Sequence, residues 1–234
     1  MITVISLGGS IVAPDAVDVE YLAAFKALIE ERIAASAAAR FVLVTGGGAP
    51  ARRYQSAYHA VLRHAGADEG ESSAAEADWI GIMATRLNAQ LVRAAFAAHA
   101  PDAVVTDPTA PFTWQSRVLV AAGWKPGFSS DNDAVLLARR FGAPLVINLS
   151  NIEKVYTADP KLDSTARALD AISWADFRRL TGDEWTPGKN VPFDPVASRN
   201  AEEAGIRVIC AAGKNIPNLR NILTGAPFTG TTIG

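Results

Sequence analysis

Two short glycine clusters constrain this chain more than any other feature of its sequence. Each lies between a strand-like apolar run and a helix-like segment: Gly8, Gly9 and Ser10 after residues 2–7, and Gly46, Gly47 and Gly48 after residues 41–45. Because glycine lacks a Cβ, the main chain there can approach a ligand closely, and amides at the start of a helix attract anions. Two clusters predict two phosphate sites, one for a donor nucleotide and one for a phosphorylated or phosphorylatable acceptor. This arrangement is typical of a kinase.

The common nucleotide-binding motifs do not explain these glycines. A Walker A loop needs lysine followed by Ser or Thr, whereas Lys189 is followed by Asn190. Residues 46–51 satisfy the G-x-G-x-x-A dinucleotide pattern, which also requires an acidic residue at the end of the next strand. The acidic residues at about the right distance are Asp68, Glu69 and Glu71, and they lie in a polar, Ala-rich stretch without a strand pattern. The sequence therefore excludes a P-loop protein and a Rossmann dehydrogenase.

Composition excludes several classes of partner. The chain has 234 residues and a formal net charge of −2, so we expect neither nucleic acid nor a membrane as a partner. Its single cysteine, Cys210, lies in an apolar run, which predicts a buried structural thiol and a reducing compartment. No basic leader precedes the first apolar run, and no apolar stretch approaches membrane-spanning length. We therefore expect a cytoplasmic protein that binds small soluble ligands.

Short apolar runs alternate with longer helical patterns along the chain. The runs predict six strands, at Ile2–Leu7, Phe41–Thr45, Ala103–Thr106, Val118–Ala121, Leu145–Leu149 and Arg207–Ala211. Several of them lack polar alternation, as strands covered on both faces do. The pattern predicts an α/β fold, namely a three-layer α/β/α sandwich with a mostly parallel central sheet.

The segments between the strands have helical patterns. Two apolar stripes repeat at helical spacing and are expected in the core: Leu22, Phe25, Leu28 and Ile29, and Ile80, Met83, Leu87 and Leu91. Residues 131–141 begin with an acid and are followed by Gly142, the asymmetry expected of a capped helix. Residues 181–195 are too rich in Pro, Trp and Gly for a regular element, which predicts a mobile flap.

Several segments, taken in order, resemble one protein family. They are Leu7–Ser10; Gly46–Gly48 with Arg52; Asp78–Ile82 with Thr85, Arg86, Asn88 and Ala89; Ser129–Asp131; Val155–Pro160; Asp194, Pro195 and Ala197; and Gly230–Ile233. Together they resemble the amino acid kinase superfamily, and within it the archaeal-type uridylate (UMP) kinases, over nearly the whole chain. The resemblance implies a single amino acid kinase domain at 1–234, with an acceptor-binding part at roughly 1–140 and an ATP-binding part at roughly 141–234. It also implies phosphoryl transfer from MgATP to UMP, giving UDP in pyrimidine nucleotide biosynthesis, and commonly a homohexamer.

The resemblance implies a set of residues for each substrate. ATP would contact Gly9, Ser10, Gly48, Ser150, Asn151, Tyr156 and Asp159, and UMP would contact Gly47, Arg52, Asp78, Trp124, Lys125, Pro126, Gly127, Phe128, Ser129 and Ser130. These residue types suit their tasks, because amides and arginine bind phosphate, an aromatic ring can cover adenine, and a carboxylate accepts from ribose hydroxyls. Asp131 and Arg52 are the expected catalytic residues. Mg²⁺ is expected with ATP, and the sequence identifies no ligand for it.

Ordinary structural roles compete with several of these assignments. Asp78 precedes an apolar helical pattern and is also an expected N-cap. Asp131 stands at the start of the next helical pattern, where aspartate is common. Arg52 occupies a helical position at which a solvated surface charge is the usual finding.

The cation that would stabilise the transferred phosphoryl group is not identified by the sequence. Many relatives have a lysine directly after the glycine triplet, where this chain has Ala49. Lys125, Lys154 and Lys189 are the candidates, because a lysine acts as a mobile point charge toward phosphate.

Two other functions remain open. The run Asp131–Asp133 resembles glutamate 5-kinase and Trp124 makes the acceptor loop bulky, so the acceptor could be glutamate, isopentenyl phosphate or a carbamate-like carboxylate. The missing lysine at Ala49 would instead suit a non-catalytic relative that binds a nucleotide or an oxyanion, as in molybdenum storage proteins.

Overall fold

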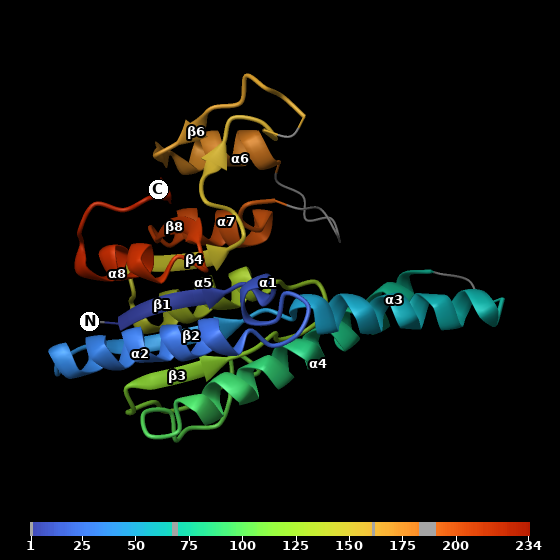
Figure 1. The fold of residues 1–234 in the computed structure, drawn as a ribbon. Helices are drawn as coiled ribbons and strands as arrows, with labels where there is room; N and C mark the ends of the chain where they lie inside the picture. The colour runs from blue at the N-terminus through green and yellow to red at the C-terminus, as the bar shows by residue number, and fades with distance from the viewer. Residues whose placement is uncertain (1, 67–69, 161, 183–190) are drawn as a thin grey trace.

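A seven-stranded sheet forms the centre of the structure, a computed structural model that describes residues 2–66, 70–160, 162–182 and 191–234 (Figure 1). The strand order is β3-β2-β1-β4-β8-β9-β7. The strands are β1 (Ile2–Leu7), β2 (Arg40–Thr45), β3 (Val118–Ala121), β4 (Leu145–Ser150), β7 (Ala171–Ile172), β8 (Arg207–Ala212) and β9 (Thr231–Ile233). All neighbouring strands pair in parallel except β8 and β9. Two further strands, β5 (Val155–Tyr156) and β6 (Ala168–Leu169), form a separate hairpin.

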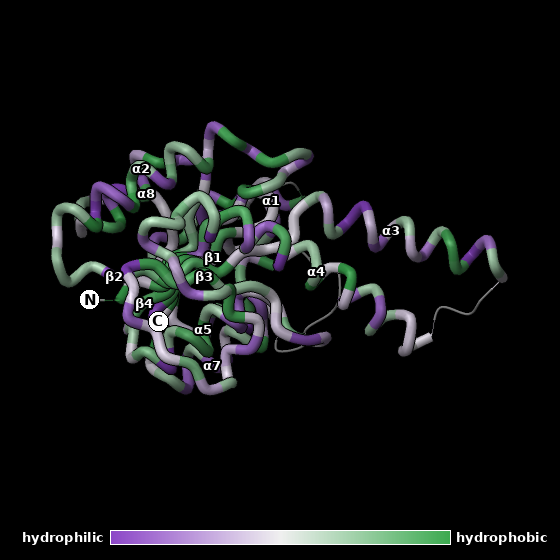
Figure 2. Tube along the Cα trace, turned by 90° about the horizontal axis from the view of Figure 1, so that it is seen from below, coloured by the Kyte–Doolittle hydropathy of each residue, from purple (hydrophilic) through white to green (hydrophobic). Residues whose placement is uncertain are grey.

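Helices cover both faces of the sheet, which confirms the predicted α/β/α layers. The helices are α1 (Gly9–Val12), α2 (Val19–Ala35), α3 (Gly48–His64), α4 (Glu71–Ala95), α5 (Ser130–Phe141), α6 (Trp174–Thr181), α7 (Pro195–Glu203) and α8 (Ile216–Thr224). Figure 2 shows α2 and α8 on one side of the strands and α5 and α7 on the other. The described residues include no helix that is long and apolar enough to cross a membrane.

Alternating side chains of the central strands divide the core in two. In β1, Ile5 and Leu7 pack with α2 and the C-terminal half of α4, whereas Val4 packs with α5, α6 and α7. These β1 side chains lie on both faces of the sheet and are fully buried, which explains why the strand is a continuous apolar run in the sequence. Cys210 is buried in the second half of the core as a free thiol, as predicted.

One predicted strand does not form. Residues 103–106 contribute only a single parallel bridge, between Val105 and Ala121. Prolines at positions 101 and 108 bracket the segment, and proline restricts its own backbone and that of the residue before it. The short strands β5, β6, β7 and β9 were not predicted. The predicted flap at 181–195 lies largely outside the described residues, in 183–190.

The apolar stripe predicted for the core side of α4 was wrong. Met83 and Leu87 are 58% and 69% exposed, and Leu91 is 39% exposed. A different face of α4 packs into the core, through Ala89, Val92 and other residues. Figure 2 shows that α3 and the first half of α4 project as an arm beyond the sheet, where no other described helix covers them.

The sheet has a topological switch point at β1. The chain passes from β1 to β2 on one side, whereas β4 pairs with β1 on the other. Open parallel sheets bind ligands beyond the carboxyl ends of their strands at such a point. Both glycine clusters lie there, because β1 leads into Gly8 and β2 leads into Gly46.

The two glycine loops pack main chain against main chain. A Cβ on Gly9 would lie 2.0 Å from the amide nitrogen of Gly48, and one on Gly46 would lie 2.5 Å from that of Gly9. Gly48 also has a φ of +68°, which favours glycine. Each loop is therefore restricted to glycine by the other loop and not only by a ligand.

We predict that Gly9→Ala lowers the free energy of unfolding by about 3 kcal/mol or more, because its Cβ would collide with rigid backbone. Gly70→Ala is the matched control, since a Cβ there meets nothing within 4 Å and φ is −83°. The control should remain within about 1 kcal/mol of the parent. Urea unfolding of the three proteins measures both values, and equal stabilities would contradict this packing.

Candidate functional site

The predicted donor residues of the first glycine loop meet the end of β4. The Gly8 amide donates to the carbonyl of Leu149 at 2.8 Å, which places Gly9 and Ser10 beside Ser150. The Ser150 hydroxyl accepts from the amide of Ile152 at 3.1 Å, and the following Asn151 is exposed. The structure therefore brings together four of the residues predicted to bind ATP, with Gly48 across from Gly9 as a fifth.

Arg52 lies on α3 beside the loop that leaves α1. Its Nη2 donates to the carbonyl oxygen of Pro14 at 3.4 Å, and its side chain is exposed. Its neighbour Arg53 pairs with Asp15 on the same loop. A guanidinium held by one long contact is available to bind an oxyanion at the glycine loops.

The remaining predicted ATP residues lie in the hairpin that follows β4. Tyr156 is in β5, where it pairs with Ala168 of β6, and Asp159 lies in the turn beyond. The carbonyl of Asp159 accepts from the amides of Leu162 and Asp163, which closes that turn. These residues therefore occupy an ordered hairpin at the end of the ATP-binding segment.

Asp78 connects α4 to the predicted acceptor loop. Its Oδ2 accepts the amide of Gly127 at 2.7 Å, so the structure brings these two predicted UMP residues together. Partial burial raises the pKa of Asp78, and the Gly127 amide opposes that shift. Asp78 is not the N-cap that its sequence position indicates. The Ala-rich stretch before it is helical, so α4 begins at Glu71 and its N-cap is Gly70. Its carboxylate is therefore directed at the loop.

Two side chains of α4 without a predicted role hold the start of the same loop. The hydroxyl of Thr85 accepts the amide of Gly123 at 2.8 Å. Arg86 donates to the carbonyls of Trp124 at 3.0 Å and Gly123 at 3.4 Å. The signal for them was present in the sequence as the T-R-L-N pattern two to three helical turns after Asp78.

The acceptor loop carries an aromatic pair with a lysine over it. The rings of Trp124 and Phe128 have centroids 5.0 Å apart. The ammonium of Lys125 lies 4.0 Å from the Trp124 ring and 4.9 Å from the Phe128 ring. Pro126 and Gly127 form the turn between them, and Gly127 has a φ of +83°. Cation–π contacts of this kind pre-position the lysine on the loop.

Asp131 lies at the junction of β1, α5 and α7. Its Oδ1 accepts from the hydroxyl of Ser6, two residues before Gly8, at 3.0 Å. Burial raises the pKa of Asp131 to about 6, which the Ser6 hydroxyl opposes and the charge of Asp194 reinforces. The N-cap of α5 is Ser129, whose hydroxyl accepts the amide of Asn132 at 3.3 Å. Asp131 is thus free of the capping role and lies next to the first glycine loop, with Ser130 preceding it.

Asp133 is a fully buried carboxyl that sequence reasoning left without a role. Its Oδ2 accepts the amide of Trp124 at 3.2 Å, and its Oδ1 has no partner among the described residues. Burial raises its pKa to about 7, which the Trp124 amide opposes and the charge of Asp131 reinforces. The carboxyl therefore faces the loop backbone from inside the core.

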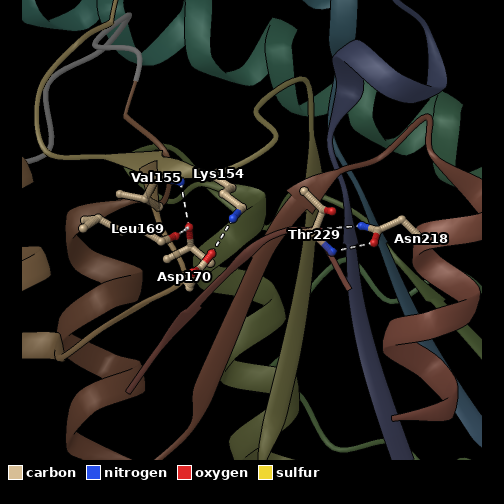
Figure 3. A network of polar contacts seen from close by, with 7 residues as sticks. Lys154, Val155, Leu169, Asp170, Asn218 and Thr229 are labelled. Atoms are coloured by element: carbon tan, nitrogen blue, oxygen red, sulfur yellow. Dashed lines mark hydrogen bonds and ion pairs between the residues drawn. The ribbon is translucent and has the colours of Figure 1, made fainter. Parts of the chain in front are cut away.

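The three lysines that are candidates for a phosphate contact differ in position and in partner. Lys154, just before β5, pairs with Asp170, just after β6 (Figure 3). Next to this pair the hydroxyl of Thr231 accepts the amide of Val155 and donates to the carbonyl of Leu169. Lys125 lies on the acceptor loop, and Lys189 lies outside the described residues. Within the described part of the chain, no group of three or more His, Cys, Asp or Glu side chains is placed to hold a metal ion.

The chain is similar over its length to proteins of one family. A family model described as "Amino acid kinase family" matches residues 1–212. Proteins named uridylate kinase from Thermoplasma volcanium and Methanospirillum hungatei are each 34% identical to this chain. These alignments cover 98% of this chain and 96% and 93% of the two relatives. A crystal structure of uridylate kinase from Archaeoglobus fulgidus superposes with a TM-score of 0.80 and 32% identity, and all of both chains is covered.

The buried carboxyls predict an unusual pH dependence of stability. A pKa raised from near 4 to about 7 means that the folded state binds the proton more tightly than the unfolded chain, so this contribution to stability falls as pH rises from about 4 to 7. Asp133→Asn removes the ionisation and keeps an oxygen for the Trp124 amide. The variant should gain on the order of 1–2 kcal/mol relative to the parent at pH 8, and little at pH 4.

Urea unfolding at pH 4, 6 and 8 measures this difference. Asp163→Asn is the control, because Asp163 is exposed and hydrogen bonds from Thr165 lower its pKa, which predicts a change of opposite sign. Parallel pH profiles for the parent and Asp133→Asn would show that the carboxyl is not destabilised by burial.

Proposed function

The chain belongs to the amino acid kinase family, and on that premise we propose that it is a nucleoside monophosphate kinase that transfers the γ-phosphoryl group of ATP to UMP, giving ADP and UDP. The proposal rests on one observation, that several groups meet at one edge of the sheet. They are the two glycine loops in main-chain contact, the Asp131 carboxylate, and the loop 124–130, whose Gly127 amide donates to Asp78. The relatives named uridylate kinase support the choice of UMP.

The donor would lie across the ends of β1 and β4. The amides of Gly9, Ser10 and Gly48 suit the donor phosphates, and Arg52, in α3 after the second glycine loop, suits the acceptor phosphate. Adenine and ribose would then extend along Ser150 and Asn151 toward Tyr156 and Asp159, which supply a flat ring and an acceptor of hydrogen bonds. In this arrangement residues from about 141 onward are the ATP-binding part of the chain, together with the glycine loops.

The acceptor would lie between α4 and the loop 124–130. Asp78 offers its second carboxylate oxygen to the ribose hydroxyls while it holds Gly127. The main chain of Gly47 packs on α4 near Gly81, so its amide can reach an acceptor phosphate beside the donor loop. The hydroxyls of Ser129 and Ser130 border the same position.

Asp131 would act where the phosphoryl group is transferred. Phosphoryl transfer depends on in-line positioning and on neutralising charge, so a carboxylate beside the glycine loops is suited to orient Mg²⁺-bound water or a cation. Mg²⁺ binds few protein carboxylates and takes most of its ligands from phosphates and water, so the Asp131 carboxylate and the ATP phosphates would suffice to hold it. The metal would supply charge neutralisation at the β- and γ-phosphates.

The geometry disfavours the glutamate-type alternative. That interpretation rested on the run Asp131–Asp133, but Asp133 is fully buried and accepts the Trp124 amide. A carboxyl engaged inside the core is not presented to an acceptor. The cytoplasm remains the proposed location, in keeping with a buried, free Cys210.

We predict that the purified protein forms UDP from UMP and MgATP with a kcat/KM at least tenfold above that for CMP, glutamate or isopentenyl phosphate. Asp131→Asn should lower kcat at least tenfold with a smaller effect on the KM for UMP, because the carboxylate acts mainly in the transition state. A coupled ADP assay with direct detection of UDP measures both. ATP binding without turnover on any acceptor would favour the non-catalytic alternative.

We also propose that the protein is a homo-oligomer, up to the hexamer that the family resemblance implies, and that the exposed α4 stripe is one of its contacts. Trp79, Met83, Leu87 and Leu91 lie four residues apart along α4, and each is 39–69% exposed. A helix stripe can pack antiparallel on its own copy across a two-fold axis, which buries it without a second kind of surface.

Leu87→Asp should weaken self-association at least tenfold, because a charge would enter the apolar contact. Leu162→Asp is the control, since Leu162 is 87% exposed and lies outside the stripe. Light scattering after gel filtration gives the mass of each protein. An unchanged mass for Leu87→Asp, or a monomeric parent, would contradict the assigned contact.

A further inference from the structure

Lys214 stands at the donor edge of the sheet, although its sequence position gave no reason to select it. It follows β8, whose carboxyl end lies beside that of β4. The amide of Gly213 donates to the carbonyl of Ser150 at 2.8 Å. A Cβ on Gly213 would lie 2.9 Å from Ile11 of α1, so the backbone before Lys214 packs against the turn that follows the first glycine loop.

The main chain of Ser150 thus joins two segments. On one side the Gly8 loop contacts it, since a Cβ on Gly8 would lie 3.5 Å from the Ser150 Cα. On the other side it accepts the Gly213 amide. Lys214 is therefore one residue away from the backbone that frames the proposed donor site.

The ammonium of Lys214 is paired with Asp18. Its Nζ lies 2.8 Å from Asp18 Oδ2, while Asp18 Oδ1 accepts the amide of Tyr21 at 3.0 Å as the N-cap of α2. The hydrogen bond from Lys214 is the main reason that the pKa of Asp18 is lowered. The side chain of Lys214 is 54% exposed, so solvent screens the pair and a long, flexible side chain is not locked in it.

The other lysines and arginines near this edge have different interaction partners. Lys154 pairs with Asp170, and Lys125 lies over the rings of the acceptor loop. Arg53 pairs with Asp15, while Arg52 donates to the carbonyl of Pro14. Lys214 is the described lysine that combines a position beside Ser150 with an exchangeable partner.

We propose that Lys214 binds the phosphate chain of the donor nucleotide and leaves Asp18 when the nucleotide enters. A polyphosphate carries several charges and offers charge-assisted hydrogen bonds, whereas Asp18 offers one carboxylate in a screened setting. Asp18 thus holds the lysine near the site and competes with the nucleotide for it. The inference rests on the proposed function, because it assumes that ATP occupies this edge.

The two partners of the pair can be tested with opposite outcomes. Lys214→Ala removes the cation and should weaken binding of a non-hydrolysable ATP analogue about tenfold, with a matching rise in the KM for ATP and an unchanged KM for UMP. Asp18→Asn removes the competing charge but keeps a side chain that caps α2 equally well. It should strengthen binding of the analogue two- to fivefold, and the double variant should resemble Lys214→Ala.

Lys26→Ala is the matched control, because Lys26 forms an ion pair with Glu30 along α2, away from the sheet edge. Calorimetry with the ATP analogue measures all five proteins, and circular dichroism confirms their fold. Binding by the parent with no change in Lys214→Ala would overturn this inference alone. Binding absent from the parent would overturn the proposed function as well, and a KM change for UMP but not ATP would move Lys214 to the acceptor.

Discussion

The main-chain contact between the two glycine loops is the constraint on which the proposed site depends. Strands β1 and β2 pair residue for residue from Ile2 with Arg40 to Leu7 with Thr45, so their loops leave the sheet at the same level. Gly9 and Gly48 then meet with no room for a Cβ on Gly9. The register of the sheet therefore sets the separation of the two amide-lined loops, and this separation does not depend on any side-chain rotamer. In-line transfer between two bound phosphates requires such a fixed separation.

A polar layer beneath these loops makes the site costly to fold. Ser6 interrupts the apolar side of β1, and its hydroxyl donates to Asp131 inside the protein. In addition to burial, the charge of Asp194 raises the pKa values of Asp131 and Asp133, and the charge of Asp131 raises the pKa of Asp133. Such groups lower stability at neutral pH, and they cluster at functional sites because the chemistry needs them there. The closely packed apolar faces around them allow the fold to tolerate this cost.

Local patterns in the sequence predicted the elements that are buried on both faces and failed where tertiary position decides. Continuous apolar runs identified β1, β2, β3, β4 and β8 because each is covered by helices on both sides. Helical spacing found α4 but not its core face, since small side chains such as Ala89 face the sheet while Met83 faces outward. The family resemblance placed Asp78 beside its loop, but the grip of Arg86 on Trp124 and the position of Lys214 near Ser150 depend on contacts between distant segments. No local periodicity encodes such contacts.

Helix α4 ties these elements to one another. Asn88 donates to the carbonyls of Gly46 and Gly47 at 2.8 and 3.2 Å, so α4 also holds the second glycine loop. Thr85 and Arg86 hold the start of the acceptor loop from the same helix. The exposed stripe runs along another face of that helix, which means that a contact burying the stripe would stiffen the segment that positions both loops. Assembly and acceptor binding would then share one rigid body, and their coupling would need no conformational change beyond a restriction of helix motion.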